Sequence, residues 1–284
     1  MPDPMPAASL VQYAQYGLAL IGLVLVALWY LVPKFQPLRL APPRMPRWDA
    51  SIIDTAQVCW VVFASVFVGQ LLAGSLFRQL GLSEGSGWTS VLAALGFQGF
   101  LVVVLPLFFL YRRTAGRPLP GAGVTPAAPL TDRILLGAAV FCIALPFVAG
   151  TSFVSTYAMQ LLGLDSRPQE LAGYFNNGTP PPLLLALTLI SVVVVPLSEE
   201  ILFRAGLFRI SCRYLPRWAA LLLSALAFAA LHNSMVHFIP LTVLGVIFAL
   251  AYEKTGSLLV PVLAHALFNL NSIVGLLAGL GASS

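Results

Sequence analysis

Charged residues are scarce in this chain of 284 residues, where Asp, Glu, Lys and Arg together make up only 9%. Soluble globular domains carry roughly 25% charged residues, and disordered chains contain few apolar ones. Here 59% of the residues are hydrophobic and the mean hydropathy is +0.91. The composition therefore excludes both of these classes and predicts an all-α polytopic membrane protein.

Cysteine is also rare, with three residues in the chain, Cys59, Cys142 and Cys212. The number is odd and the spacing matches no metal site, which excludes a disulfide-rich secreted domain. Each lies in or beside an apolar stretch, so we expect small, buried hydrophobic side chains. The net charge of +5 does not indicate a nucleic-acid partner, because the basic residues do not cluster on one amphipathic face.

Eight apolar stretches approach the length of about 20 residues with which a helix crosses the roughly 30 Å hydrocarbon layer. They are residues 9–32, 53–77, 89–111, 133–160, 182–210, 217–233, 236–253 and 257–281. The sixth and seventh stretches are short, and only the segment HNSM separates them. We expect about eight transmembrane helices.

The basic residues predict how these helices are oriented. Twelve of the fifteen Lys and Arg residues lie on odd-numbered connections between the stretches. Short loops that are rich in Lys and Arg remain in the cytoplasm. We therefore expect a multi-pass protein of the cell membrane, with its odd-numbered loops in the cytoplasm and both chain termini outside.

The third connection is rich in Pro, Gly and Ala, and its sequence RRTAGRPLPGAGVTPAAPLTDR is typical of an exposed linker. It predicts two regions: an N-terminal three-helix membrane region with a cytoplasmic linker (1–125) and a five-helix region (126–284). We find no internal repeat of the kind that many transporters contain.

Ionisable side chains are nearly absent from the first three stretches and cluster in the last five. Each costs about 2.5–3.5 kcal/mol or more at the centre of a membrane helix. Such residues are tolerated where they face the bundle interior or a water-filled cavity. The cluster, with one amide, consists of Glu199, Glu200, Arg204, His232, His265 and Asn269. We expect an intramembrane active-site cavity lined by these polar groups.

Helix geometry gives the two carboxylates different roles. Glu200 and Arg204 are four residues apart with the acid first, which is the favourable order for an ion pair on a helix. Glu199 points about 100° away from Glu200 and has no such partner on its own helix. We therefore expect Glu199 to face the cavity, where it would suit a general base and then a general acid.

The two histidines each share a helical face with a residue one turn away. The pairs are Phe228 with His232 and His265 with Asn269. Pro196 precedes Glu199 by three residues, and Pro261 precedes His265 by four. Because proline removes a helix hydrogen bond, we expect a kink beside each of these polar residues.

Three motifs now stand in order: EExxxR at 199–204, FxxxH at 228–232 and HxxxN at 265–269. In a polytopic helical protein they resemble the signatures of the CPBP family, the CAAX proteases and bacteriocin-processing enzymes, also called the Abi family, which includes CAAX prenyl protease 2. The resemblance covers roughly Pro182 to Leu280, without a departure at a motif position. It implies an intramembrane glutamic endopeptidase acting on membrane-associated peptides or protein termini, which are CAAX sequences for some members.

The resemblance also implies roles for these residues. Glu199 and His232 would activate a water molecule, while His265 and Asn269 would stabilise the oxyanion that its attack creates. The supporting residues would be Glu200, Arg204 and Phe228. This mechanism needs no cofactor, and its partners are the bilayer and a membrane-associated substrate.

Alternatives remain at this point. Glu199, His232 and His265 also form an acceptable set of catalytic zinc ligands with an open fourth position. The absence of HExxH and the placement of the three residues on separate helices favour the metal-free mechanism. A non-catalytic scaffold, immunity factor or regulator of the same family is the second functional hypothesis. A transporter with a proton relay is the third, and the missing repeat disfavours it.

Overall fold

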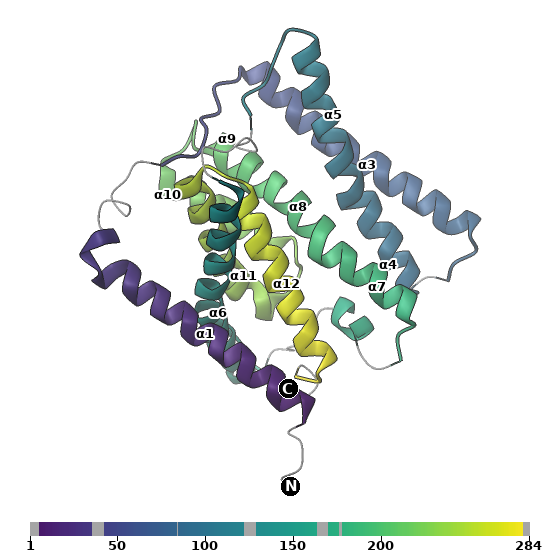
Figure 1. Cartoon of the computed structure of the whole chain (residues 1–284). Helices are drawn as coiled ribbons and strands as arrows, with labels where there is room; N and C mark the ends of the chain where they lie inside the picture. Colours follow the sequence, from purple (N-terminus) through teal and green to yellow (C-terminus); the bar gives the residue numbers. More distant parts are fainter. Residues whose placement is uncertain are drawn as a thin grey trace.

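The structure is a computed structural model that describes residues 6–35, 43–83, 85–121, 129–163, 170–175 and 178–280. Every regular element within these ranges is helical (Figure 1). Seven of the helices found there are long and apolar enough to cross a membrane. The prediction of an all-α polytopic membrane protein is confirmed.

Five of the candidate spans are single helices. They are α1 (Ala7–Leu31), α3 (Ile52–Gln79), α6 (Leu130–Leu161), α11 (Met235–Thr255) and α12 (Leu259–Leu277). The short helices η1 (Pro33–Phe35) and η3 (Glu170–Phe175) belong to connections.

The other two candidate spans are composite. The third consists of α4 (Gly87–Ala94), η2 (Leu95–Gly99) and α5 (Phe100–Thr114). The fifth consists of α7 (Pro181–Leu189), η4 (Ile190–Val194), α8 (Val195–Glu200), η5 (Ile201–Phe208) and α9 (Arg209–Ser211). In these two spans η2, η4 and η5 are π-helical.

The sixth predicted stretch forms a shorter helix than expected. α10 runs from Arg217 to Ala230, which is 14 residues. At about 1.5 Å per residue this is roughly 21 Å, less than the hydrocarbon thickness of roughly 30 Å. Asn233 has a positive φ of 46° in the turn that follows, so the chain reverses before α11. The eight stretches thus correspond to seven candidate spans and one short apolar helix, and His232 follows directly after the end of that helix.

The fifth span joins the two sides of the bundle (Figure 1). On one side α6 packs against α1, α11 and α12, around a core that includes Phe141, Leu244 and Phe248. On the other side α3 packs against η2 and α5. The third span contacts the fifth through η2 with η4 and α8, and through α5 with α8. The predicted boundary between residues 125 and 126 lies outside the described residues, and the division into two regions stays a prediction.

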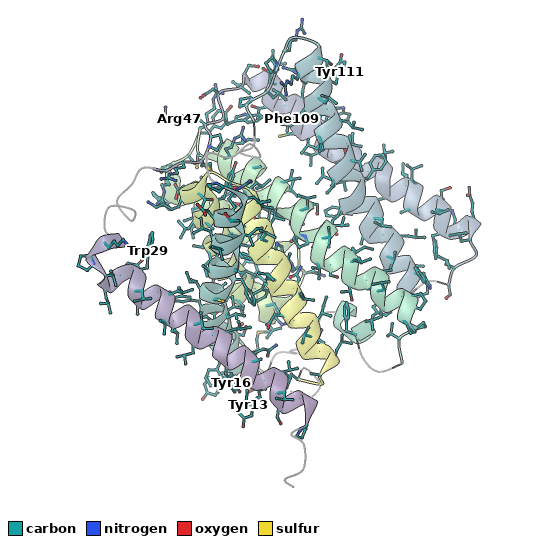
Figure 2. All side chains as sticks on the ribbon, in the orientation of Figure 1. Tyr13, Tyr16, Trp29, Arg47, Phe109 and Tyr111 are labelled. Atoms are coloured by element: carbon teal, nitrogen blue, oxygen red, sulfur yellow. The ribbon has the colours of Figure 1, made fainter. Side chains whose placement is uncertain are left out.

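The outward faces of the spans are apolar and exposed, as expected of surfaces that contact lipid. Figure 2 shows Tyr13 and Tyr16 toward the start of α1 and Trp29 near its other end, and aromatic residues near both ends of a helix are typical of a membrane span. Cys59 on α3 is exposed, so the expectation that it would be buried is wrong, whereas Cys142 is buried and Cys212 is half-buried. An apolar residue in a membrane helix needs no cover from protein, because lipid supplies it.

Candidate active site

The fifth span carries Glu199 and Glu200 on α8, between the π-helical segments η4 and η5. Single π turns inside helices occur frequently at functional sites. At the end of η4 the N–H of Val195 bonds to the carbonyl of Ile190, five residues back. Pro196 follows and has no N–H for the next carbonyl, that of Ser191. The sequence predicts a kink at Pro196. The structure has a π-helical segment there instead, and the carbonyl of Ser191 must accept a hydrogen bond from outside the helix.

Asn269 on α12 supplies that donor. Its Nδ2 lies 2.8 Å from the carbonyl oxygen of Ser191 and donates to it. The bond ties α12 to the fifth span next to the two glutamates. An amide nitrogen carries two N–H groups, so one of them remains for a further acceptor.

Glu200 is completely buried and has two partners on one oxygen. Arg204 Nη1 lies 3.0 Å from Glu200 Oε1, and His265 Nδ1 lies 2.9 Å from the same atom. The Arg204 guanidinium also lies over the ring of Phe228, at 4.5 Å from the centroid, and its Nη2 donates to the carbonyl of Gly245. The ion pair that the i,i+4 spacing predicts is present, inside a cage of aromatic rings.

Glu199 is 8% exposed and has weaker partners than Glu200. Its Oε1 accepts a hydrogen bond of 3.4 Å from Gln98 Nε2. Its Oε2 lies 3.8 Å from His265 Nε2 and has no hydrogen-bond partner among the described residues. Each carboxylate has one oxygen without a hydrogen-bond partner among the described residues, but only Glu200 is paired with arginine.

The hydrogen bonds also fix how the two histidine rings are protonated. A carboxylate and a carbonyl only accept, so His265 Nδ1 donates to Glu200 and His232 Nδ1 donates to the carbonyl of Phe228, at 2.9 Å. In a neutral ring the Nε2 atom then carries a lone pair. The Nε2 of His265 is the atom that faces Glu199.

Phe228 lies between the two histidines. Its ring centroid is 4.9 Å from that of His232 and 5.7 Å from that of His265. No ion pair joins His232 to Glu199 in the part of the chain that the structure describes. Glu199 and His265 are therefore in direct proximity. His232 is separated from His265 by the ring of Phe228, which contacts both histidines.

Four of the six predicted polar groups are buried in the structure. Glu199, Glu200, Arg204 and His265 are each at most 8% exposed. The aromatic residues Phe203, Phe228 and Phe248 surround Arg204 and fill the space beside it. These four side chains are therefore packed inside the bundle, whereas His232 and Asn269 are partly exposed.

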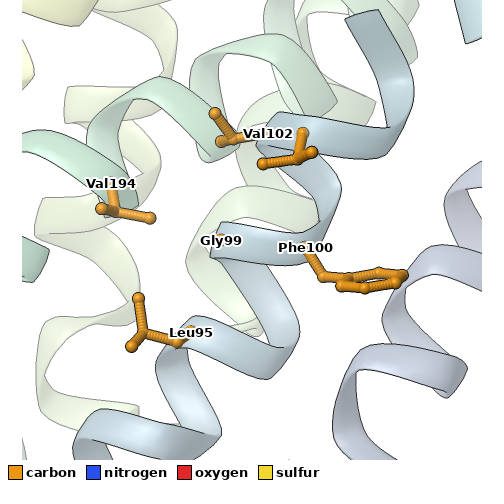
Figure 3. Close-up of a pocket in the computed structure, with 6 residues that line it drawn as sticks. Leu95, Gly99, Phe100, Val102 and Val194 are labelled. Atoms are coloured by element: carbon orange, nitrogen blue, oxygen red, sulfur yellow. The ribbon is translucent and has the colours of Figure 1, made fainter. Parts of the chain in front are cut away.

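An apolar groove of about 470 Å³ lies between the third and fifth spans (Figure 3). Its lining residues are Leu95, Gly99, Phe100, Val102, Val103 and Val194. Gln98, which contacts Glu199, directly precedes one of these residues. The groove is therefore lined in part by η2, the helix segment that carries Gln98.

The three residues that could serve as zinc ligands do not fit that metal in this arrangement. Within the described ranges, no group of three or more His, Cys, Asp or Glu side chains is placed to hold a metal ion. Both histidines use Nδ1 for a hydrogen bond and leave Nε2 available, so the misfit lies in the placement of the side chains: the ring of Phe228 lies between the two histidines.

Sequence reasoning missed Gln98. The search for polar residues in the spans covered ionisable groups, and Gln98 is neutral and 101 residues away from Glu199. The available signal was an amide within the apolar segment LGFQGF, where a polar side chain must find a partner.

Comparison with known proteins gives a family for one part of the chain. Residues 181–271 match the family model described as type II CAAX prenyl endopeptidase Rce1-like. This segment contains all three motifs, so the family resemblance inferred from them is confirmed there.

Two bacterial proteins are similar in sequence. The "Uncharacterized 24.3 kDa protein" of Escherichia coli is 29% identical over 174 residues, which cover 58% of this chain and 72% of that protein. The "Putative membrane peptidase YdiL" of Bacillus subtilis (strain 168) is 32% identical over 88 residues, which cover 31% of this chain and 35% of that protein. No solved structure matches the chain significantly.

Proposed function

We propose that this membrane protein, which carries the Rce1-like segment 181–271, is an intramembrane endopeptidase. The observation that carries the proposal is that two adjacent carboxylates differ in their partners and in their burial. Glu200 is completely buried and its Oε1 is held by Arg204 and His265, while Glu199 is slightly exposed and has no arginine partner, only a long hydrogen bond from Gln98 and a distant contact with His265. Paired titratable groups with different surroundings are typical of acid–base catalysis.

In the proposed reaction Glu199 acts first as a general base. It takes a proton from a water molecule as the water oxygen attacks the carbonyl carbon of the scissile peptide bond. It then returns the proton to the nitrogen of the leaving amine as the C–N bond breaks. His232 assists by accepting a hydrogen bond from the water at Nε2, which its bond to the Phe228 carbonyl leaves available.

The negative charge that develops on the carbonyl oxygen is stabilised by His265 and Asn269. Preorganised donors of this kind often contribute most to acyl-transfer catalysis. Asn269 has one N–H beyond the one that binds Ser191. Donation from His265 Nε2 requires the imidazolium form, since Nδ1 already carries the proton that bonds to Glu200. Glu200, Arg204 and Phe228 hold these groups in place.

The proposed substrates are membrane-associated peptides or protein termini, including CAAX-like ones. The groove between the third and fifth spans is apolar, which suits a substrate that arrives within the bilayer, and its lining residue Gly99 directly follows Gln98. The reaction as proposed needs no metal. We place the odd-numbered connections in the cytoplasm and both termini outside.

The experiment that tests the proposal compares peptide termini across the proteome of cells that carry the wild type or Glu199→Gln. Gln keeps the size of the side chain and removes the base. The matched control is Asp132→Asn, which changes an exposed carboxylate at the start of α6. We expect new termini near membrane segments with the wild type and the control, and none with Glu199→Gln. Equal termini in all three strains, at equal protein levels, would contradict a peptidase and favour a scaffold or regulator.

Metal dependence is tested with the same substrate after purification. We expect cleavage to persist after a zinc chelator and dialysis. Loss of cleavage that added zinc restores would show that Glu199, His232 and His265 rearrange into a metal site.

A further inference from the structure

The third span contributes a polar side chain to the buried cluster, although it lies outside the Rce1-like segment 181–271. Gln98 in η2 donates from Nε2 to Glu199 Oε1 at 3.4 Å. A carboxylate oxygen accepts hydrogen bonds, so the NH₂ end of the amide must be the end that faces Glu199. The contact is directional, and it engages the oxygen of Glu199 that does not face His265.

The other end of the amide is also informative. Gln98 Oε1 is buried and has no hydrogen-bond partner among the described residues, and the same holds for Glu199 Oε2. Buried polar atoms are normally paired, so two unpaired acceptors on residues in contact point to a ligand that donates. A water molecule and a peptide N–H are donors of the kind that the proposed reaction uses.

The backbone next to Gln98 packs closely against α3. η2 is π-helical, and Gly96 within it packs against Gly69 of α3. A Cβ placed on Gly69 would lie 1.9 Å from the carbonyl oxygen of Gly96, so the two backbones touch without side chains between them. η2 therefore packs between α3 and the η4 and α8 segments of the fifth span.

We propose that Gln98 is a positioning residue for Glu199 and that it brings the N-terminal spans into the reaction. By holding Oε1, it turns Oε2 toward His265 and the attacking water. The inference rests on the proposed peptidase function, and it assigns a role to a residue that the three motifs do not include.

The test uses full-length protein in proteoliposomes and the substrate found by the comparison of termini. Gln98→Met keeps the length of the side chain and removes the amide. We expect kcat to fall by about 10–100-fold, because a small misplacement of a catalytic group costs rate on this scale, with KM little changed. Gln98→Asn retains an amide on a stem one methylene shorter, and we expect it to recover part of the lost kcat.

The matched control is Gln70→Met. Gln70 Nε2 donates to the carbonyl of Ala93 at 2.8 Å, so it also joins α3 to the third span, but away from the glutamates. We expect wild-type kcat from this variant. A general effect of helix packing would lower kcat equally in Gln70→Met and Gln98→Met, and that result would overturn the inference.

Two further outcomes separate this inference from the proposed function. If Glu199→Gln abolishes cleavage while Gln98→Met and Gln98→Asn both keep wild-type kcat, then the role of Gln98 is refuted and the peptidase stands. If Glu199→Gln cleaves as fast as the wild type, the proposed function itself fails. A rise in KM without a fall in kcat for Gln98→Met would assign Gln98 to substrate binding and would also overturn the positioning role.

Discussion

At the scale of single residues, Glu199 and Glu200 are neighbours in the sequence with different surroundings in the bundle. The i,i+4 spacing to Arg204 is local, so it could be predicted that Glu200 would take the arginine. The bond from His265 to Glu200 spans 65 residues, and the bond from Gln98 to Glu199 spans 101. Contacts over such separations depend on how helices pack, which hydropathy and spacing do not determine.

Arg204 gives the prediction at this scale. It is completely buried, paired with Glu200 and enclosed by aromatic rings. Arg204→Met would leave a buried carboxylate without its cation, which costs roughly 3–5 kcal/mol. We expect a clear fall in the midpoint of thermal unfolding in detergent. Glu200→Gln removes the carboxylate charge, so the double variant Arg204→Met/Glu200→Gln should regain much of the lost stability. Equal losses in Arg204→Met and in the double variant would contradict the argument.

At the scale of elements, the apolar stretches predict the helices well because the bilayer requires long apolar runs. The first predicted stretch, 9–32, corresponds to Ala7–Leu31, and the second, 53–77, to Ile52–Gln79. The early end of α10 and the π-helical segments could not be predicted in this way. The end of α10 coincides with the positive φ of Asn233, and η4 lies beside the missing N–H of Pro196 and the hydrogen bond from Asn269 of α12.

The crossing of α3 and η2 gives the prediction at this scale. Gly69→Ala places a methyl group against the Gly96 backbone, so the helices must separate, at a cost of roughly 1–3 kcal/mol. Gly74→Ala on the same helix is the control, because its Cβ would meet Arg78 Nη1 at an ordinary 3.9 Å. We expect Gly69→Ala to unfold at a lower temperature and to lose kcat, since Gln98 moves with η2. Equal behaviour of the two variants would show that the crossing is not tight.

At the scale of the whole molecule, the connections meet in two groups. Arg44 and Met45 in the first connection donate backbone hydrogen bonds to the carbonyl of Glu253 at the end of α11. Arg209 at the end of the fifth span donates to the carbonyls of Pro120 and Gly121 in the third connection, each at 2.8 Å. Connections that the charge pattern assigns to one side of the membrane therefore contact one another in the structure.

The second and fourth connections form the other group. Tyr174 in η3, between the fourth and fifth spans, donates from its hydroxyl to the carbonyl of Gly85, between the second and third spans. If one span too many or too few had been assigned between the second and fourth connections, these two connections would lie at opposite ends of the bundle and could not be in contact. These contacts are those that the predicted alternation of sides requires, and the sides themselves stay a prediction of the positive-inside rule.

The direction of the bundle across the membrane can be measured with two introduced cysteines. The substitutions are Ser83→Cys and Ala115→Cys, because Ser83 is exposed on the second connection and Ala115 is exposed on the third. The native cysteines are replaced by Ala, including Cys212 beside the fifth span, although burial raises the pKa of its thiol and slows its reaction. In intact bacterial cells a maleimide that cannot cross the membrane should label Ser83→Cys at once and Ala115→Cys only after permeabilisation. Because the two positions are on opposite faces, the reverse pattern would mean that the bundle is inverted and that the basic connections lie outside.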